Sequence, residues 1–150
     1  MRLNEAGLAN HKEWEEKGYA LPKFDRAAVT ENTKKSPRWI HFGAGNIFRA
    51  FQANVAQKLI EEGVLSTGLI AAEGYDYEII DKMYRPHDNL GILVTLKADG
   101  SIEKTVVGSI VESLILDSQD EAEYSRLKGI FCSPSLQMAS FTITEKGYSL

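Results

Sequence analysis

One short stretch constrains the fold more than any other part of the chain. Trp39–Phe42 is an apolar run with aromatic and β-branched members, which is typical of a buried strand. Gly43-Ala44-Gly45 follows at once, and the next residue, Asn46, favours the N-cap of a helix. Gly63 is placed to end that helix, whose apolar stripe is Ile47, Phe51, Val55 and Leu59. The sequence therefore predicts a strand, a glycine turn and a helix of about four turns.

A second strand and helix follow directly. Leu69–Ala72 is another short apolar run, and it ends at Glu73 and Gly74. Residues 75–84 are predicted to form a helix that Pro86 closes, with one apolar face made by Ile79, Ile80 and Met83. The order strand, helix, strand, helix indicates a parallel sheet with right-handed crossovers.

The next segment has a different pattern. Residues 90–96 and 102–111 are strand-like, and the Asp99-Gly100 pair between them is a strong hairpin signal. A polar helix is predicted over 119–128, with Asp117-Ser118 as its N-cap and Gly129 at its end, and a further strand over 136–144. The predicted fold class is α/β, a Rossmann-like parallel sheet with helices on both faces and an antiparallel hairpin insertion. Residues 1–37 are expected to be an N-terminal extension with one or two short helices, and 38–150 the main domain.

Composition excludes several classes of protein. With 43% hydrophobic and 25% charged residues, the chain is neither disordered nor a fibrous or disulfide-rich protein. The net charge of −4 argues against a non-specific nucleic-acid binder. No apolar run approaches the roughly 18 residues of a membrane helix, and the polar start does not resemble a signal peptide. The single cysteine, Cys132, fits a reducing cytoplasm.

The glycine turn is the main candidate for chemistry. Gly43 permits a tight strand-to-helix turn, and Gly45 lets the backbone approach a pyrophosphate that binds the helix N-terminus. The third glycine of the usual dinucleotide-binding pattern is replaced by Phe48, so a wider gap or a changed helix tilt is expected. The alternative is a plain turn whose glycines only shape the backbone.

Two charged residues extend this candidate site. Glu73, at the end of the second strand, is placed to accept hydrogen bonds from the adenine ribose and to repel a 2′-phosphate, which favours NAD over NADP. The alternative is that Glu73 is only a solvated acid at the strand end, in which case Asp76 and Glu78 are the other candidates for binding the ribose. Arg49 either pairs with a phosphate oxygen or faces water.

No catalytic or metal-binding group is assigned within the chain. His41 lies inside the first strand and is expected to be packed and hydrogen-bonded. His11 and His87 have no partner at metal-ligand spacing, and Cys132 has no recognisable base nearby.

The chain resembles the long-chain mannitol dehydrogenase and hexuronate (fructuronate, tagaturonate) reductase family. The resemblance is carried by Ile40–Phe51, similar to the family's glycine–x–glycine–x–x–x–arginine–alanine stretch, by Val107–Ile110 and by Ser140–Tyr148. It extends over about three-quarters of the chain. Many relatives carry histidine where Phe48 stands, and the local sequence leans toward the uronate reductases.

The resemblance implies an NAD(P)-dependent oxidoreductase of polyols or uronates. Such enzymes have an N-terminal Rossmann-type domain and a helical C-terminal domain, which holds a catalytic lysine with asparagine and histidine. The chain is therefore expected to be a cofactor-binding part, inactive alone, with an incomplete domain over 38–150 and a tendency to self-associate. The residues expected to bind NAD are Gly43, Gly45, Asn46, Ile47, Phe48, Arg49, Glu73, Glu145 and Gly147. The alternative function is a stand-alone NAD-binding or sensing module without catalysis.

Overall fold

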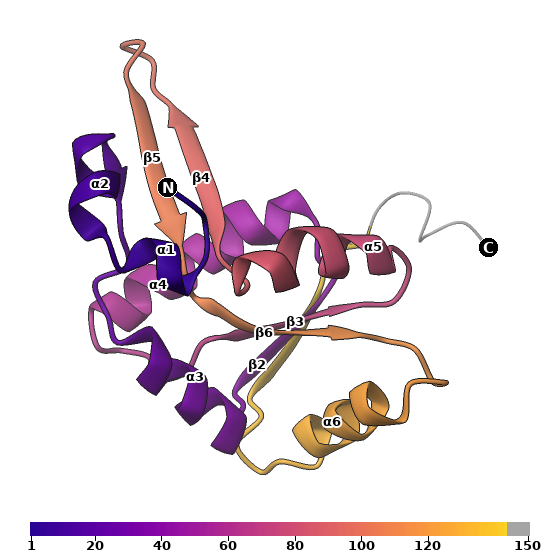
Figure 1. Ribbon diagram of the computed structural model, residues 1–150. Coiled ribbons are helices and arrows are strands. Elements are labelled where there is room, and N and C mark those ends of the chain that lie inside the picture. The colour runs from indigo at the N-terminus through magenta and orange to yellow at the C-terminus, as the bar shows by residue number, and fades with distance from the viewer. Residues whose placement is uncertain (144–150) are drawn as a thin grey trace.

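A four-stranded parallel sheet forms the centre of the computed structural model, which describes residues 1–143 (Figure 1). The sheet contains β2 (Trp39–Phe42), β3 (Leu69–Glu73), β6 (Ile110–Ile115) and β7 (Met138–Phe141) in the order β6-β3-β2-β7. Within this sheet, the strand that comes first in sequence, β2, lies between the second, β3, and the fourth, β7, which is the strand order of a Rossmann half-sheet. The predicted α/β fold class is confirmed.

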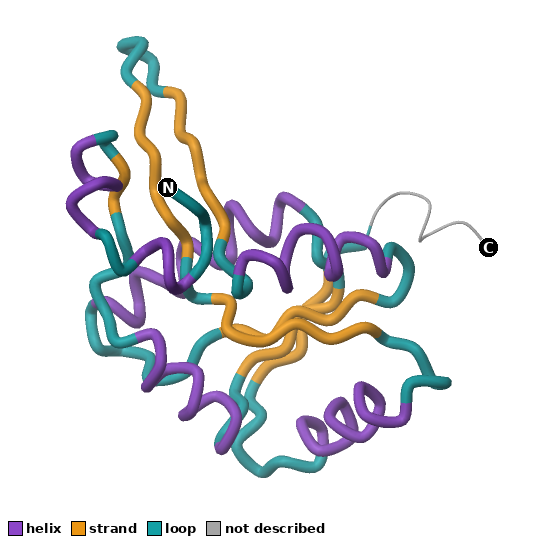
Figure 2. The backbone as a smooth tube through the Cα atoms, viewed as in Figure 1, coloured by secondary structure: helices purple, strands orange, loops and turns teal. Residues whose placement is uncertain are grey.

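Helices cover both faces of this sheet (Figures 1 and 2). On one face, Leu69 and Ala71 of β3 pack against Ala53 and Ala56 of α4 (Ala53–Glu61). On the other, Ile70 and Ala72 lie in a cluster with Ile130 of α6 (Glu121–Phe131). Alternation along β3 therefore supplies apolar side chains to two separate cores, as expected for a strand buried on both faces.

The predicted hairpin projects from the sheet as part of a second, three-stranded sheet (Figure 1). Strands β4 (Gly91–Leu96) and β5 (Ile102–Val107) are antiparallel, and the two-residue strand β1 (Tyr19–Ala20) pairs with β5 in parallel. The hairpin prediction is confirmed, whereas a single strand over 102–111 is wrong. The run bends at Gly108-Ser109, so that β5 belongs to the hairpin and β6 to the parallel sheet.

The amide of Gln57 holds this bend. Its Nε2 donates to the Val106 carbonyl at 3.0 Å, and its Oε1 accepts from the Gly108 N–H at 2.7 Å. Gln57 is buried on α4, and unpaired backbone groups at such a position are costly. One side chain therefore satisfies the backbone on both sides of the point where the chain changes sheets.

The N-terminal segment is more ordered than a surface arm. It contains three helices, α1 (Glu5–Leu8), α2 (His11–Glu16) and α3 (Arg26–Lys35), where one or two were predicted. Trp14 is 1% exposed, packs with Leu90 and Val106, and donates its indole N–H to the Gly7 carbonyl at 2.9 Å. This apolar contact, which links residues far apart in the sequence, holds the segment on the hairpin.

Two other helices differ from their predicted bounds. The 75–84 helix is α5 (Tyr77–Ile79), a π-helical turn η2 (Ile80–Tyr84) and a 3₁₀ turn η3 (Arg85–His87) that contains Pro86. Helix α6 begins after Asp120, whose side chain accepts from the N–H groups of residues 122 and 123, and Gly129 lies inside it. The N-cap is therefore Asp120 and not the predicted Asp117-Ser118. Within residues 1–143, no helix is long and apolar enough to cross a membrane.

Candidate cofactor-binding site

The glycine turn begins with a residue that has to be glycine. Gly43 has φ +111°, and a Cβ there would lie 3.3 Å from the carbonyl oxygen of Thr142, just after β7. Its N–H donates to the Ala72 carbonyl at 2.8 Å, which extends the β2–β3 pairing by one residue. Gly43 thus allows the chain to leave β2 sharply while remaining bonded to β3.

Gly45, unlike Gly43, has free space beside its Cα. A Cβ built there meets nothing within 4 Å, so the space beside the turn is open. Helical structure starts at Asn46, with the Arg49 N–H donating to the Gly45 carbonyl at 3.2 Å. Asn46 is therefore the first helical residue, and its prediction as the N-cap is wrong by one position. Among the described residues, the N–H groups of Gly45, Asn46 and Ile47 have no acceptor.

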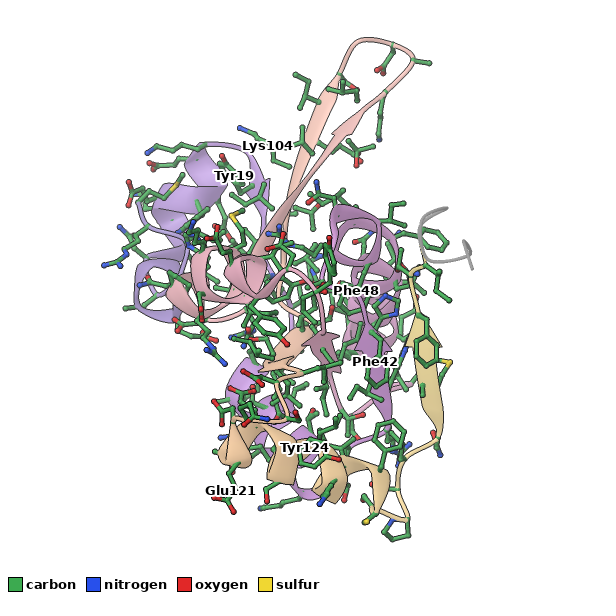
Figure 3. The ribbon with its side chains drawn as sticks, turned by 90° about the vertical axis from the view of Figure 1, so that its right-hand side faces the viewer. Tyr19, Phe42, Phe48, Lys104, Glu121 and Tyr124 are labelled. Carbon is green, nitrogen blue, oxygen red and sulfur yellow. The ribbon has the colours of Figure 1, made fainter. Side chains whose placement is uncertain are left out.

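Phe48 explains how the turn works without a third glycine. Its side chain, labelled in Figure 3, is fully buried. It lies stacked on the His41 ring, with 4.0 Å between ring centroids and 5° between planes. Phe48–Gln52 form a π-helical turn, η1, in which the Ala53 N–H donates to the Phe48 carbonyl. The predicted α-helix of four turns is thus replaced in its first part by a wider turn.

The π-helical turn also changes which face of the helix is buried. Most of the predicted stripe is outside: Ile47 is 65% exposed, Phe51 66% and Val55 41%, whereas Leu59 is partly buried. The buried set is Phe48, Ala53, Ala56, Gln57 and Ile60. A turn closed by an i→i−5 bond contains an additional residue, so a regular four-residue spacing no longer tracks one face.

His41 is buried and hydrogen-bonded, as predicted. Its Nδ1 lies 2.8 Å from the Ser140 hydroxyl and its Nε2 lies 2.8 Å from the Thr142 hydroxyl. Ser140 also accepts from the Trp39 indole at 2.7 Å, so one hydroxyl bonds both of these side chains of β2. Burial lowers the pKa of His41 from its ordinary 6.5 to about 4. The neutral ring therefore ties β2 to β7 beneath the glycine turn.

Glu73 is the last residue of β3 and reaches back to the turn. Its Oε2 accepts from the Ala44 N–H at 2.8 Å, and its Oε1 accepts from Tyr75 and Asp76 N–H at 2.9 and 3.3 Å. A carboxylate has about four acceptor positions, so one remains available for a hydroxyl of a ligand. The alternative candidates lie beyond the strand end, and Glu78 is paired with Lys82 at 2.6 Å.

Arg49 is partly buried, and its pairing with a phosphate oxygen stays a prediction. Its guanidinium lies 5.4 Å from the centre of the Tyr84 ring, within cation–π range. It lines a cavity of about 370 Å³ together with Asn46, Met83 and His87. Among residues 1–143, Arg49 has no acidic partner within salt-bridge distance. Its charge is therefore uncompensated on the side of the helix that bears the turn.

Ala44 and Tyr84 belong to the site although sequence reasoning missed them. The Tyr84 hydroxyl donates to the Ala44 carbonyl at 2.8 Å, and both residues are fully buried. Burial raises the pKa of Tyr84 far above its ordinary value, so the hydroxyl remains a donor. Their separation of forty positions gives no local signal, and only the strand–helix order hints that the two segments meet.

Two of the residues predicted to bind NAD, Glu145 and Gly147, are outside the described residues. His87 donates from Nδ1 to the Leu3 carbonyl at 2.8 Å, and Cys132 is exposed. No group of three or more histidine, cysteine or acidic side chains in the described part is arranged to hold a metal ion.

The strand order and the glycine turn define a Rossmann-type domain, and known proteins show which kind. No protein-family model matches the chain. It is 50% identical over 150 residues to D-mannonate oxidoreductase of Thermotoga maritima, spanning 28% of that protein. It is 30% identical over 138 residues to mannitol 2-dehydrogenase of Cereibacter sphaeroides, of which it spans 25%. A polyol:NADP oxidoreductase of Gluconobacter oxydans is 26% identical over 118 residues, or 76% of this chain and 23% of that protein.

A solved structure agrees with these sequence relationships. Mannitol 2-dehydrogenase of Pseudomonas fluorescens, in a ternary complex with NAD and D-mannitol, superposes with a TM-score of 0.77 at 27% identity, covering 99% of this chain and 28% of the other. The chain is therefore similar in sequence and fold to mannitol dehydrogenases and a D-mannonate oxidoreductase, as the sequence resemblance indicated. It spans about a quarter of the length of these relatives.

Proposed function

We propose that this chain is the cofactor-binding part of an NAD-dependent oxidoreductase that acts on a polyol or a hexuronate. The observation that carries the proposal is the set of open N–H groups at Gly45, Asn46 and Ile47, directly beside the Glu73 carboxylate. Backbone donors at a helix start bind a pyrophosphate, and a carboxylate at the end of the neighbouring strand binds ribose hydroxyls. The residues of this site are the backbone of Gly43–Arg49 and the side chain of Glu73.

The nicotinamide cofactor supplies hydride chemistry when it is bound. The chain's own residues hold and orient it: Gly45 leaves room for the pyrophosphate, and Glu73 has one acceptor position left for a ribose hydroxyl. Phe48 contributes only its backbone, because its ring is buried against His41.

NAD is favoured over NADP by charge. A 2′-phosphate on the ribose would lie against the Glu73 carboxylate, and like charges at hydrogen-bonding distance repel. One similar protein is named for NADP and another is solved with NAD, so the charge at this strand end is the basis for the preference proposed here.

The substrate assignment rests on the relatives. The 50% identical relative is named for D-mannonate, a sugar acid, which favours a hexuronate or its reduced acid over a neutral polyol. Catalysis by the whole protein belongs to the same proposal, with the acid–base group supplied from outside residues 1–143.

Titration of the protein with NADH and with NADPH tests the cofactor proposal. We expect NADH to bind with the higher affinity. The variant Gly45→Val should fold normally, because its Cβ enters open space, yet lose NADH binding, because that space is where the pyrophosphate approaches. Unimpaired NADH binding by Gly45→Val would contradict the assignment.

Gly129→Ala is a matched control for this experiment. Gly129 also has nothing within 4 Å of a built Cβ, but it lies on α6, away from the turn. Its NADH affinity should equal that of the unmodified protein, and its helix should gain about 1 kcal/mol of stability.

A further inference from the structure

Side chains hold both backbone polar groups of Ala44, its N–H and its carbonyl. Glu73 accepts from the Ala44 N–H at 2.8 Å, and Tyr84 donates to the Ala44 carbonyl at 2.8 Å. Glu73 comes from the end of β3 and Tyr84 from the end of η2, so the second strand–helix unit reaches over to the turn of the first. Ala44 is fully buried, and neither group can be satisfied by solvent instead.

The rest of the turn has few other constraints. Gly43 is bonded to Ala72 through its N–H, and the next described backbone bond is the one from Arg49 to the Gly45 carbonyl. Between them lies Gly45, the residue with the least steric restriction. Without the two side-chain bonds at Ala44, the direction of the open N–H groups at positions 45–47 would be weakly fixed.

We infer that Tyr84 is a positioning residue for the cofactor: together with Glu73 it clamps Ala44, so that the open N–H groups of Gly45, Asn46 and Ile47 converge before any ligand arrives. The inference rests on the proposed function. It gives Glu73 a second role, holding the turn as well as facing the ribose, and assigns Tyr84 a role that depends on its hydroxyl. Preorganised donors bind an anion more tightly because no ordering is left to be completed on binding.

Two properties make Tyr84 a clean test residue. Its ring is fully buried and carries the Arg49 guanidinium above it, and both contacts persist in phenylalanine. Tyr84→Phe therefore removes one hydroxyl and little else. The matched control is Tyr77→Phe, which removes the tyrosine hydroxyl bonded to the Leu116 carbonyl at 3.0 Å, outside the turn.

The first measurement is cofactor affinity. Tyr84→Phe should raise the dissociation constant of NADH about three- to tenfold, as expected for one hydrogen bond, and raise that of NADPH by the same factor. Tyr77→Phe should change neither. An NADH dissociation constant for Tyr84→Phe within the error of the unmodified protein would overturn the inference while leaving the proposed function intact.

The second measurement needs no ligand. Hydrogen exchange of the Ala44 amide, which donates to Glu73, should be faster in Tyr84→Phe and in Glu73→Ala, and unchanged in Tyr77→Phe, whereas amides in β3 keep their protection. If the unmodified protein does not bind NADH, the cofactor proposal fails but exchange still reports on the clamp. Unchanged exchange in both variants would show that Ala44 is held by packing alone and would refute the clamp.

Discussion

The imidazole of His41 lies flat against the phenyl ring of Phe48, with 4.0 Å between ring centroids. One ring comes from β2 and the other from η1, on opposite sides of the glycine turn. A third glycine would let the helix pack close to the strand, and here the two stacked rings fill the wider gap instead. The His41 ring is also hydrogen-bonded to the hydroxyls of Ser140 on β7 and Thr142 just after it. The packing of the turn therefore depends on a neutral histidine.

This dependence predicts a loss of stability in acid. The pKa of His41 falls from 6.5 to about 4 on folding, so the unfolded chain binds a proton that the folded chain excludes between those values. Unfolding free energy should decrease as the pH falls below about 6.5, by about 3 kcal/mol from this group at pH 4. When the unfolding free energy from urea titrations is plotted against pH, His41→Leu should show a smaller decrease toward acid than the unmodified protein. His11→Gln, at an exposed position, should retain the steep slope, and an equally steep slope in His41→Leu would contradict the assignment.

Gly43 and Gly45 should respond differently to alanine. Gly43→Ala places a side chain at φ +111° and close to the Thr142 carbonyl, which should cost about 1–3 kcal/mol of unfolding free energy. Gly45→Ala has neither problem and should change stability by less than about 0.5 kcal/mol. Thermal unfolding of the two variants measures the difference. Equal destabilisation would mean that the turn is strained at a residue other than Gly43.

Glu73→Ala should weaken NADH binding more than NADPH binding. NADH loses the carboxylate that faces its ribose, whereas NADPH is also relieved of charge repulsion. Both lose part of the Ala44 clamp, so the ratio of the two dissociation constants is the informative quantity. We expect that ratio to move at least about tenfold toward NADPH, the range of a hydrogen bond to a charged group.

Glu78→Ala is the comparison for that experiment. Glu78 is an exposed acid on α5 whose partner is Lys82, and its removal should leave the ratio unchanged. A shift in Glu78→Ala without one in Glu73→Ala would exchange the roles of the two acids.

Trp14 should be the main attachment of the N-terminal segment. Trp14→Ala removes a side chain that is 1% exposed and should cost about 3–5 kcal/mol. Trp14→Phe retains most of the packing and loses the bond to Gly7, at a cost of about 1 kcal/mol. Proteolysis within residues 1–36 should accelerate in Trp14→Ala alone. Equal acceleration in both variants would show that the bond from the indole to Gly7, within the segment, controls proteolysis rather than the packing on Leu90 and Val106.

Local pattern was sufficient for the elements that carry the site. The strand at Trp39–Phe42 has the predicted bounds, β3 ends at the predicted Glu73, and Gly63 ends α4 with φ +73° and the bonds of a Schellman turn, Gly63 to Ile60 and Val64 to Leu59. Each of these depends on residues adjacent in sequence. The exposed stripe of Ile47, Phe51 and Val55 was beyond such reasoning, because the π-helical turn that reorients it accompanies a ring stack with a residue on the preceding strand.

The site itself was predictable in outline only. Glycine spacing and the strand-end acid identify the turn and its neighbour, but not that Glu73 is bonded to the Ala44 N–H, nor that a tyrosine forty positions away completes the arrangement. These bonds join two supersecondary units, and their existence follows from how the units dock rather than from either sequence segment.

The Gln57 amide makes the length of the hairpin independent of the parallel sheet into which the hairpin is inserted. Because this one side chain satisfies Val106 and Gly108, the strand can cross from one sheet to the other without losing backbone pairing at the crossing. The part of the hairpin beyond its pairing with β1 at Lys104, out to the Lys97–Ser101 turn, can therefore lengthen or shorten in steps of paired residues while β3 and its glutamate stay in register. In evolutionary terms, the hairpin is a region in which a lineage can vary the outer surface of the domain without disturbing its nucleotide turn.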